Sequence, residues 1–315
     1  MNRIAFLRKR SSTCLLRLFG VVSMLVAAIP AHAQNRGVYP LGMSAVNSGI
    51  TPEPGVSYSN QFLLYSRDEA KDDNGNTIAT GTNSVIMDMN TLTWVSKETF
   101  FGGARYSASV TLPFAKNDLT SDIHGNISGG SGFADSYYLP LILGWSWERV
   151  AVRAMYGFLA PTGRFHADAN DNVGSGYWTH TLSSGQTFYL TNNKVLTFSA
   201  FEMYEFHTTQ EGTGIHPGDT FDLDYSLMAT ILRKEALRLQ FGLAGYEARQ
   251  TTAKTGPGIT SAESDERYAV NALGVAANVA FPKERANVTL RFFDEFENRS
   301  TFQGYSVQVA GAISF

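Results

Sequence analysis

The chain has 315 residues, with 25 basic and 28 acidic side chains and a single cysteine. This excess of acid argues against nucleic-acid binding, which needs a basic surface. No run of 18 consecutive apolar residues occurs, which excludes a helical membrane span. Glycine and aromatic residues are frequent and long runs of strong helix formers are missing, so we expect a β-rich protein.

The first 33 residues have the pattern of a secretory signal peptide. Five basic residues and no acid precede an apolar stretch from Leu18 to Ile29, and Ala31 and Ala33 supply the small residues of an A-x-A cleavage site. A single-span anchor is the alternative, but this stretch is shorter than the ~20 residues that a helix needs to cross a bilayer. We therefore predict export, with cleavage after Ala33.

Cleavage changes the composition of the mature protein. The only cysteine, Cys14, is removed, so we expect neither a disulfide nor a lipid-modified cysteine. The remaining 282 residues carry 20 basic and 28 acidic side chains, a net charge of −8. This length is enough for one large β domain.

Apolar and polar residues alternate in many segments of the mature chain, as they do in strands with one apolar face. The alternation is clearest in "TFDLDYSLMATI", where Phe221, Leu223 and Leu227 fall on one face and Asp222 and Asp224 on the other. In chain order, the predicted strands lie near residues 55–66, 83–96, 104–114, 135–145, 150–161, 177–190, 194–206, 220–231, 237–248, 268–281, 287–297 and 302–315.

The predicted connections alternate between long and short. Long polar loops are expected at residues 67–82, 115–133, 162–175, 207–218 and 250–266, and short turns near Lys97, Glu148, Asn192, Lys234 and Lys283. A secreted β-sandwich is the alternative, but its outward face should be rich in charge, whereas the polar faces here are mainly Ser, Thr, Gln, Gly and Ala. With aromatic residues at many strand ends, the pattern predicts an all-β transmembrane antiparallel up-and-down β-barrel of about 12 strands, with short periplasmic turns and long extracellular loops.

The last ten residues, "SVQVAGAISF", fit the closing strand of such a barrel. Val307, Val309 and Ile313 alternate with small or polar residues, and the sequence stops on Phe315. We expect this strand to pair with the strand that begins near Gly55, because a spanning sheet must leave no free edge. Outer-membrane barrels of Gram-negative bacteria commonly end on an aromatic residue that the barrel assembly machinery reads, so Phe315 is the predicted assembly signal; facing lipid is its simpler role.

Charged residues recur on the predicted inward faces. They are tolerated there because the lumen is wet, whereas an Arg in the middle of the lipid face costs about 2–4 kcal/mol. One interpretation is a pore constriction whose field selects solutes, and the other is a salt-bridge network that fills a narrow barrel. The candidate lumen residues are Arg105, Arg153, Arg238, Arg291, Asp88, Asp222, Asp224, Glu202 and Glu295.

We expect no enzyme activity, no cofactor and no metal site. The mature histidines fall mostly in predicted loops, and none has a serine two positions away on the same strand, as a barrel lipase would need. No G-x-S-x-G motif, phosphate loop or metal-spaced His/Cys cluster occurs. The acidic loops at residues 72–76 and 168–172 lack the spacing of a calcium loop with its terminal glutamate.

Several motifs resemble those of the outer-membrane family named "putative meta-pathway of phenol degradation". The resemblance covers essentially the whole mature chain and implies a barrel that helps hydrophobic compounds to cross the outer membrane near aromatic catabolism. The chain is also similar in spirit to fatty-acid and toluene channels, whose N-terminal segment plugs the barrel. The motifs are "GVYPLGMSAVNSGITPEPGVSYSN" after the signal peptide, "LPLILGW" at 139–145, "YGFLAPTGRF" at 156–165, "HPGDTFDLDYS" at 216–226 and "GYEARQT" at 245–251.

These features predict three regions: a signal peptide at residues 1–33, an N-terminal segment at 34–54 and a porin-like barrel at 55–315. The N-terminal segment is a candidate short hatch, although its length argues against a complete plug. The predicted function is passive uptake of small hydrophobic or aromatic compounds, with outer-membrane lipids and lipopolysaccharide as surroundings. A structural or adhesive barrel is the main alternative, and a barrel lipase is the third.

Overall fold

The computed structural model describes residues 37–123 and 125–315, so the predicted signal peptide lies outside the described residues. Nearly all of the regular structure belongs to one antiparallel sheet of 14 strands. The elements are β1 Gly55–Lys71, β2 Thr77–Thr80, β3 Ser84–Phe100, β4 Ala104–Ser121, β5 Gly125–Phe133, β6 Ser136–Ser146, β7 Val150–Ala160, β8 Thr179–Tyr189, β9 Leu196–His207, β10 Thr220–Arg233, β11 Arg238–Gln250, α1 Ser261–Asp265, β12 Ala269–Phe281, β13 Ala286–Glu295 and β14 Phe302–Ser314.

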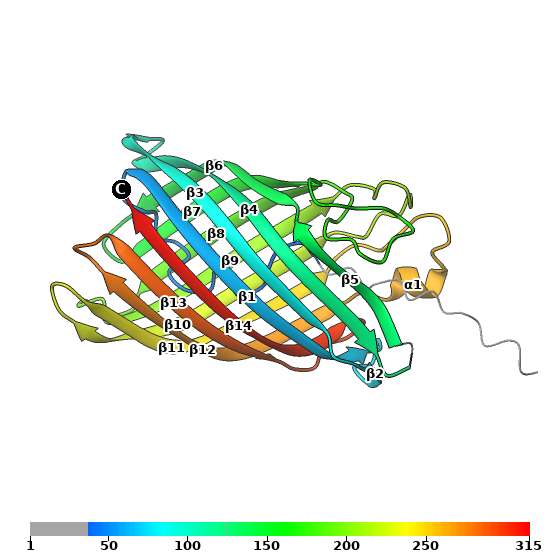
Figure 1. The fold of residues 1–315 in the computed structure, drawn as a ribbon. Helices are drawn as coiled ribbons and strands as arrows, with labels where there is room; N and C mark the ends of the chain where they lie inside the picture. Colours follow the sequence, from blue (N-terminus) through cyan, green and yellow to red (C-terminus); the bar gives the residue numbers. More distant parts are fainter. Residues whose placement is uncertain (1–36, 124) are drawn as a thin grey trace, which may run out of the picture. The chain divides into compact units, whose positions relative to one another are not determined.

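The sheet closes on itself. β14 pairs with β1 over Tyr58↔Ile313 and Phe62↔Val309, which joins the last strand to the first. β2 pairs only with β1 and β5 only with β4, and the other twelve strands form a closed barrel (Figure 1). The predicted up-and-down barrel of about 12 strands is confirmed. No helix within residues 37–123 and 125–315 is long and apolar enough to cross a membrane.

Three strands on one side of the barrel are longer than predicted. β1 and β3 have 17 residues and β4 has 18, whereas β6 and β7 have 11 each. The loops predicted at 67–82 and 115–133 therefore contain strand, including β2 and β5. Polar residues occupy both faces of these extensions, so the sequence shows no apolar alternation there, but the backbone still forms ladder hydrogen bonds.

One predicted turn is also displaced. β3 continues past Lys97 to Phe100, and the reversal occurs at Phe101, Gly102 and Gly103, all of which have positive φ. Glycine adopts this left-handed region without a steric penalty, so the Gly-Gly pair fixes the turn. We call the end of the barrel with such short reversals the turn end, and the opposite end, which carries α1, the loop end.

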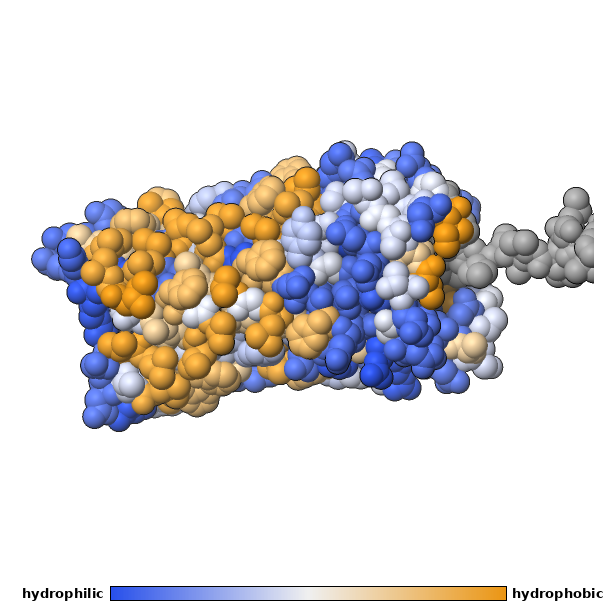
Figure 2. Space-filling model, turned by 90° about the horizontal axis from the view of Figure 1, so that it is seen from below, coloured by the Kyte–Doolittle hydropathy of each residue, from blue (hydrophilic) through white to orange (hydrophobic). Residues whose placement is uncertain are grey.

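The two faces of the wall follow the strand alternation. Partners in an antiparallel ladder share a face, and Phe62, Leu92 and Leu112 are exposed on the outside. On the face seen in Figure 2, apolar surface covers much of the half nearer the turn end, with a hydrophilic rim at that end and hydrophilic surface nearer the loop end. This is the surface expected for a barrel embedded in lipid.

The segment before β1 lies inside the barrel. Gly37 contacts Tyr268, which directly precedes β12 at the loop end, and Gly49 lies against Ala151 and Thr187 near the turn end. From there the chain passes through residues 50–54 and enters β1. The segment therefore runs down the lumen before the wall begins.

Candidate functional site: the lumen and its N-terminal segment

Buried carboxylates of the wall bind residues 38–44 of the N-terminal segment, the part nearer the loop end. Glu205 on β9 accepts hydrogen bonds from the backbone N–H groups of Val38 (2.9 Å) and Tyr39 (2.7 Å), and from the hydroxyl of Thr220 (2.8 Å). The Glu205 side chain is fully buried. A segment without regular structure has unpaired N–H groups, and the carboxyl oxygens of Glu205 satisfy two of them.

Asp224 on β10 holds the next turn of the segment in the same way. It accepts hydrogen bonds from the Tyr39 hydroxyl (2.6 Å) and from the backbone N–H groups of Gly42 (2.8 Å) and Ser44 (3.0 Å). The neighbouring Ser226 donates to the carbonyl of Ala45 at 2.6 Å. Two alternate inward residues of β10, Asp224 and Ser226, therefore fix the segment to this strand with four hydrogen bonds.

The part of the segment nearer the turn end, around Ser48, packs closely on β7 and β8. Arg153 donates from Nε to the carbonyl of Ser48 (2.6 Å), and the Ser48 hydroxyl donates to the carbonyl of Ala200 (2.7 Å). A Cβ atom at Gly185 would overlap the Ser48 carbonyl. Glycine at 185 is therefore what lets the segment lie directly on the wall.

These contacts are unevenly distributed around the lumen. Apart from a bond from Gln308 to the carbonyl of Leu41 (2.8 Å), the hydrogen bonds that join the described segment to the wall involve residues between β7 and β12. Inward residues on that side, such as Met228, are fully buried. On the opposite side some inward residues, such as Gln308 and Leu63, are also buried. Ala310 on β14, Gln61 on β1 and Thr91 on β3 are only half-buried. Space therefore remains beside these half-buried residues.

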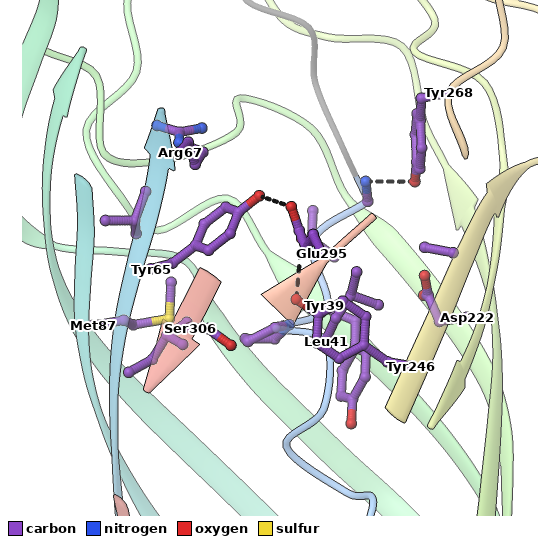
Figure 3. Close-up of a pocket in the computed structure, with 16 residues that line it drawn as sticks. Tyr39, Leu41, Tyr65, Arg67, Met87, Asp222, Tyr246, Tyr268, Glu295 and Ser306 are labelled. Atoms are coloured by element: carbon purple, nitrogen blue, oxygen red, sulfur yellow. Dashed lines mark hydrogen bonds between the residues drawn. The ribbon is translucent and has the colours of Figure 1, made fainter. Parts of the chain in front are cut away.

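A cavity of about 170 Å³ lies between the N-terminal segment and the barrel wall, on the loop-end side of this space (Figure 3). Leu63, Val85 and Met87 form an apolar side. Tyr65 and Tyr246 also line it and donate their hydroxyls to Glu295, at 2.7 and 3.0 Å. The full lining is Gly37, Val38, Tyr39, Pro40, Leu41, Leu63, Tyr65, Arg67, Val85, Met87, Asp222, Tyr246, Ala248, Tyr268, Glu295 and Ser306.

Seven of the nine candidate lumen residues are on the inner face. Asp222, Asp224, Glu295, Arg153 and Arg291 surround the segment or the cavity. Arg105 and Arg238 share the phase of inward neighbours but lie near the turn end, where Arg105 donates to the carbonyl of Lys97. The structure therefore separates a central group from two residues at the rim.

The inward assignment of Asp88 is wrong. Asp88 pairs with Phe62 on β1 and Phe114 on β4, both exposed on the outer face. It lies an even number of positions from Leu92 on the same strand, and residues separated by an even number share a face. Its carboxylate accepts hydrogen bonds from Asn60 and Asn90, so these residues form a polar cluster on the outer wall.

Glu202 was also assigned to the wrong face. It pairs with Leu223 on β10 and with Ser184 on β8, which is two positions from the exposed Leu182. Ser184 (2.8 Å) and Gln186 (2.9 Å) donate to its carboxylate. Charged side chains on the outer face are tolerated here because neighbouring polar groups satisfy them.

The sequence analysis missed Glu205 and Tyr39. Glu205 lies three residues after Glu202 in "FEMYEFH", so the wrong phase for one residue hid the other. Tyr39 gave no signal, because nothing in the alternation indicates where a segment outside the strands will lie. Within the described residues, no group of three or more His, Cys, Asp or Glu side chains is arranged to hold a metal ion.

A closed antiparallel barrel with an outer apolar band and a polar lumen is the architecture of an outer-membrane β-barrel protein. Residues 67–310 match the family described as "Putative MetA-pathway of phenol degradation", and the chain belongs to this family. The predicted resemblance and the predicted location in the Gram-negative outer membrane are confirmed. The turn end is accordingly periplasmic and the loop end extracellular.

Two solved structures have a similar fold. An outer membrane channel from Pseudomonas putida F1 is 14% identical with a TM-score of 0.67, and the match covers 85% of this chain and 98% of that one. The β domain of the Bordetella autotransporter BrkA is 11% identical with a TM-score of 0.52, covering 84% of this chain and 100% of that one. A comparison with curated protein sequences found no match.

Proposed function

We propose that this protein is a channel for the passive uptake of small hydrophobic or aromatic compounds across the outer membrane. The observation that carries the proposal is the uneven lumen, in which the N-terminal segment is hydrogen-bonded mainly to the β7–β12 side. Part of the opposite inner face, at Ala310, Gln61 and Thr91, is only half-buried. That side provides a route past the segment. Membership of the phenol-degradation family and the likeness to a channel of the same fold support this proposal.

The cavity suits a small ring compound. Its volume of about 170 Å³ is similar to that of an engineered apolar cavity of about 150 Å³ that binds benzene. Leucine, valine and methionine side chains form one side and four tyrosines contribute aromatic rings. Such a lining binds a monocyclic aromatic by apolar contact, with a few polar groups to orient it.

The N-terminal segment acts as a short hatch in this proposal. It narrows the lumen beside the cavity, and its hydrogen bonds to Glu205 and Asp224 hold it against the far wall. A solute passes along the β14–β1–β3 side. The segment thus sets the width of the route.

The test is solute flux through the purified barrel in lipid vesicles and ion conductance in planar bilayers. We expect flux of a small neutral aromatic above that of protein-free vesicles, and higher conductance for a variant that lacks residues 37–51. Mobility shift on heating checks that each variant forms a closed barrel. A folded protein that conducts no ions and passes no aromatic solute contradicts the proposal and favours a structural or adhesive barrel.

We also propose that the protein is not an enzyme. Two histidines on the strands already have hydroxyl partners: His207 bonds to Thr179 (2.8 Å) and His180 to Tyr156 (2.9 Å). Neither of these partners is a serine. Hydrolysis of a short-chain nitrophenyl ester by the purified barrel would contradict this proposal.

A further inference from the structure

The cavity contains a buried carboxylate oxygen that lacks a partner. Asp222 lines the cavity and is 1% exposed, and its Oδ2 forms no hydrogen bond. The two residues beside it in the sheet are Ala248 and Met203, which offer no polar side chain. Ala248 also lines the cavity, and its small side chain leaves room next to the carboxylate.

The surroundings of Asp222 are rich in acid. Asp222 and Glu295 line the cavity with one basic residue, Arg67. Behind the lining, Glu205 and Asp224 are fully buried and hold the N-terminal segment, and the buried Arg291 lies near Asp224. With Arg67 and Arg291 counted against these four carboxylates, acid remains in excess. A ligand with negative charge would be repelled by this set, whereas a positive charge would be attracted to it.

Aromatic rings complete the lining. Tyr39, Tyr65, Tyr246 and Tyr268 all contribute to the cavity wall. In Figure 3 the Tyr65 ring lies on the side of Glu295 that faces away from Asp222. Aromatic faces attract ammonium groups, and sites for organic cations commonly combine such rings with a carboxylate. A buried carboxylate without a partner is costly, and an ammonium group beside it would offset that cost.

We infer that this cavity binds a small organic cation, an ammonium group on an aromatic ring or short alkyl body, with Asp222 as its counter-ion. The inference rests on the channel function proposed above and names a class of solute for it. The ammonium group lies at the Asp222 end, and the apolar body lies toward Leu63 and Met87. The cavity therefore prefers a cation to a neutral compound of the same shape.

The test is calorimetric titration of the full mature protein in detergent with three ring compounds of similar size: benzylammonium, benzyl alcohol and benzoate. We expect benzylammonium to bind about tenfold tighter than benzyl alcohol, a difference of about 1.4 kcal/mol, and benzoate to bind weakest. Equal affinity of the wild-type protein for benzylammonium and benzyl alcohol overturns the inference. This comparison needs no variant.

The variant Asp222→Asn assigns the preference to its residue, with Asp294→Asn as the matched control on the exposed outer face. Loss of the preference in D222N but not in D294N is expected, and a preference retained in folded D222N overturns the role of Asp222. Flux of benzyl alcohol through vesicles tests the channel separately. Flux without a preference for the cation contradicts only the inference, whereas absence of flux for both compounds contradicts the proposed channel.

Discussion

At the residue scale, two acidic side chains determine where the N-terminal segment lies. Glu205 and Asp224 accept four backbone N–H bonds and one tyrosine hydroxyl bond from residues 38–44. A buried carboxylate is normally costly, and here its lone pairs are used by a chain that has no strand partner. Each carboxylate therefore accepts the backbone N–H bonds of the segment, as the carbonyl groups of a neighbouring strand do elsewhere in the wall.

Removing one of these acids should loosen the segment. Asp224→Ala deletes the acceptor of three bonds, each of which contributes about 1.5–3 kcal/mol when one partner is charged. We expect single-channel conductance in planar bilayers to rise several-fold and the variance of the open current to increase. Asp294→Ala, on the outer face, is the control, and unchanged conductance in D224A would show that the segment does not limit the route.

A steric change at Gly185 tests the same segment without altering charge. Gly185→Ala places a Cβ atom against the carbonyl of Ser48, so the part of the segment around Ser48 must move off β8. We expect faster cleavage of the segment by a protease added to the folded barrel. Gly311→Ala is the matched control, because the nearest atom to its Cβ is 4.0 Å away, and equal cleavage rates in the two variants would contradict this prediction.

At the scale of the element, the phase of a strand decides which face a side chain occupies. The alternation predicted the strands and the closed barrel because large apolar residues repeat every second position toward lipid. The prediction failed for Asp88 and Glu202 because a polar side chain was assumed to face the lumen. The alternation along their own strands puts both side chains on the same face as exposed apolar residues. The alternation could not predict the position of Tyr39 or the route past the N-terminal segment. Both depend on contacts between that segment and strands that are far away in sequence.

The corrected phase changes the expectation for ion selectivity. Asp88→Asn and Glu202→Gln should leave the reversal potential of the channel in a salt gradient unchanged, because both side chains point away from the lumen. Arg291→Gln should shift it toward cations, since Arg291 is buried on the inner face. A shift in the first two variants as large as that in R291Q would contradict the assigned faces.

At the scale of the whole molecule, the closing contact joins the two ends of the barrel sequence. β14 pairs with β1 along most of its length, and the backbone N–H of Phe315 donates to the carbonyl of Val56 at 2.9 Å. The Phe315 side chain is exposed. Closure therefore uses the backbone of the last residue, and its ring remains available to another partner.

This separation allows the assembly role of Phe315 to be tested. Phe315→Ala keeps the backbone bond to Val56 and removes only the ring, so the barrel should remain closed once formed. We expect less protein in the outer membrane of expressing cells, measured as the heat-modifiable fraction, with normal folding of the purified variant in detergent. Wild-type amounts in the membrane would show that the ring is not an assembly signal.

The long strands on one side determine what the cell shows to its surroundings. An 18-residue strand with a rise of about 3.3 Å and a tilt of about 40° climbs roughly 45 Å, whereas the apolar band of such barrels is about 25 Å tall. The ends of β1, β3 and β4, with β2 and β5, thus stand roughly 20 Å clear of the hydrocarbon. A macromolecule that approaches the cell from outside, such as an antibody, therefore contacts these protruding strand ends before it reaches the pore. A peptide tag inserted at Asn74 should be labelled on intact cells, and one at Lys234 only after permeabilisation.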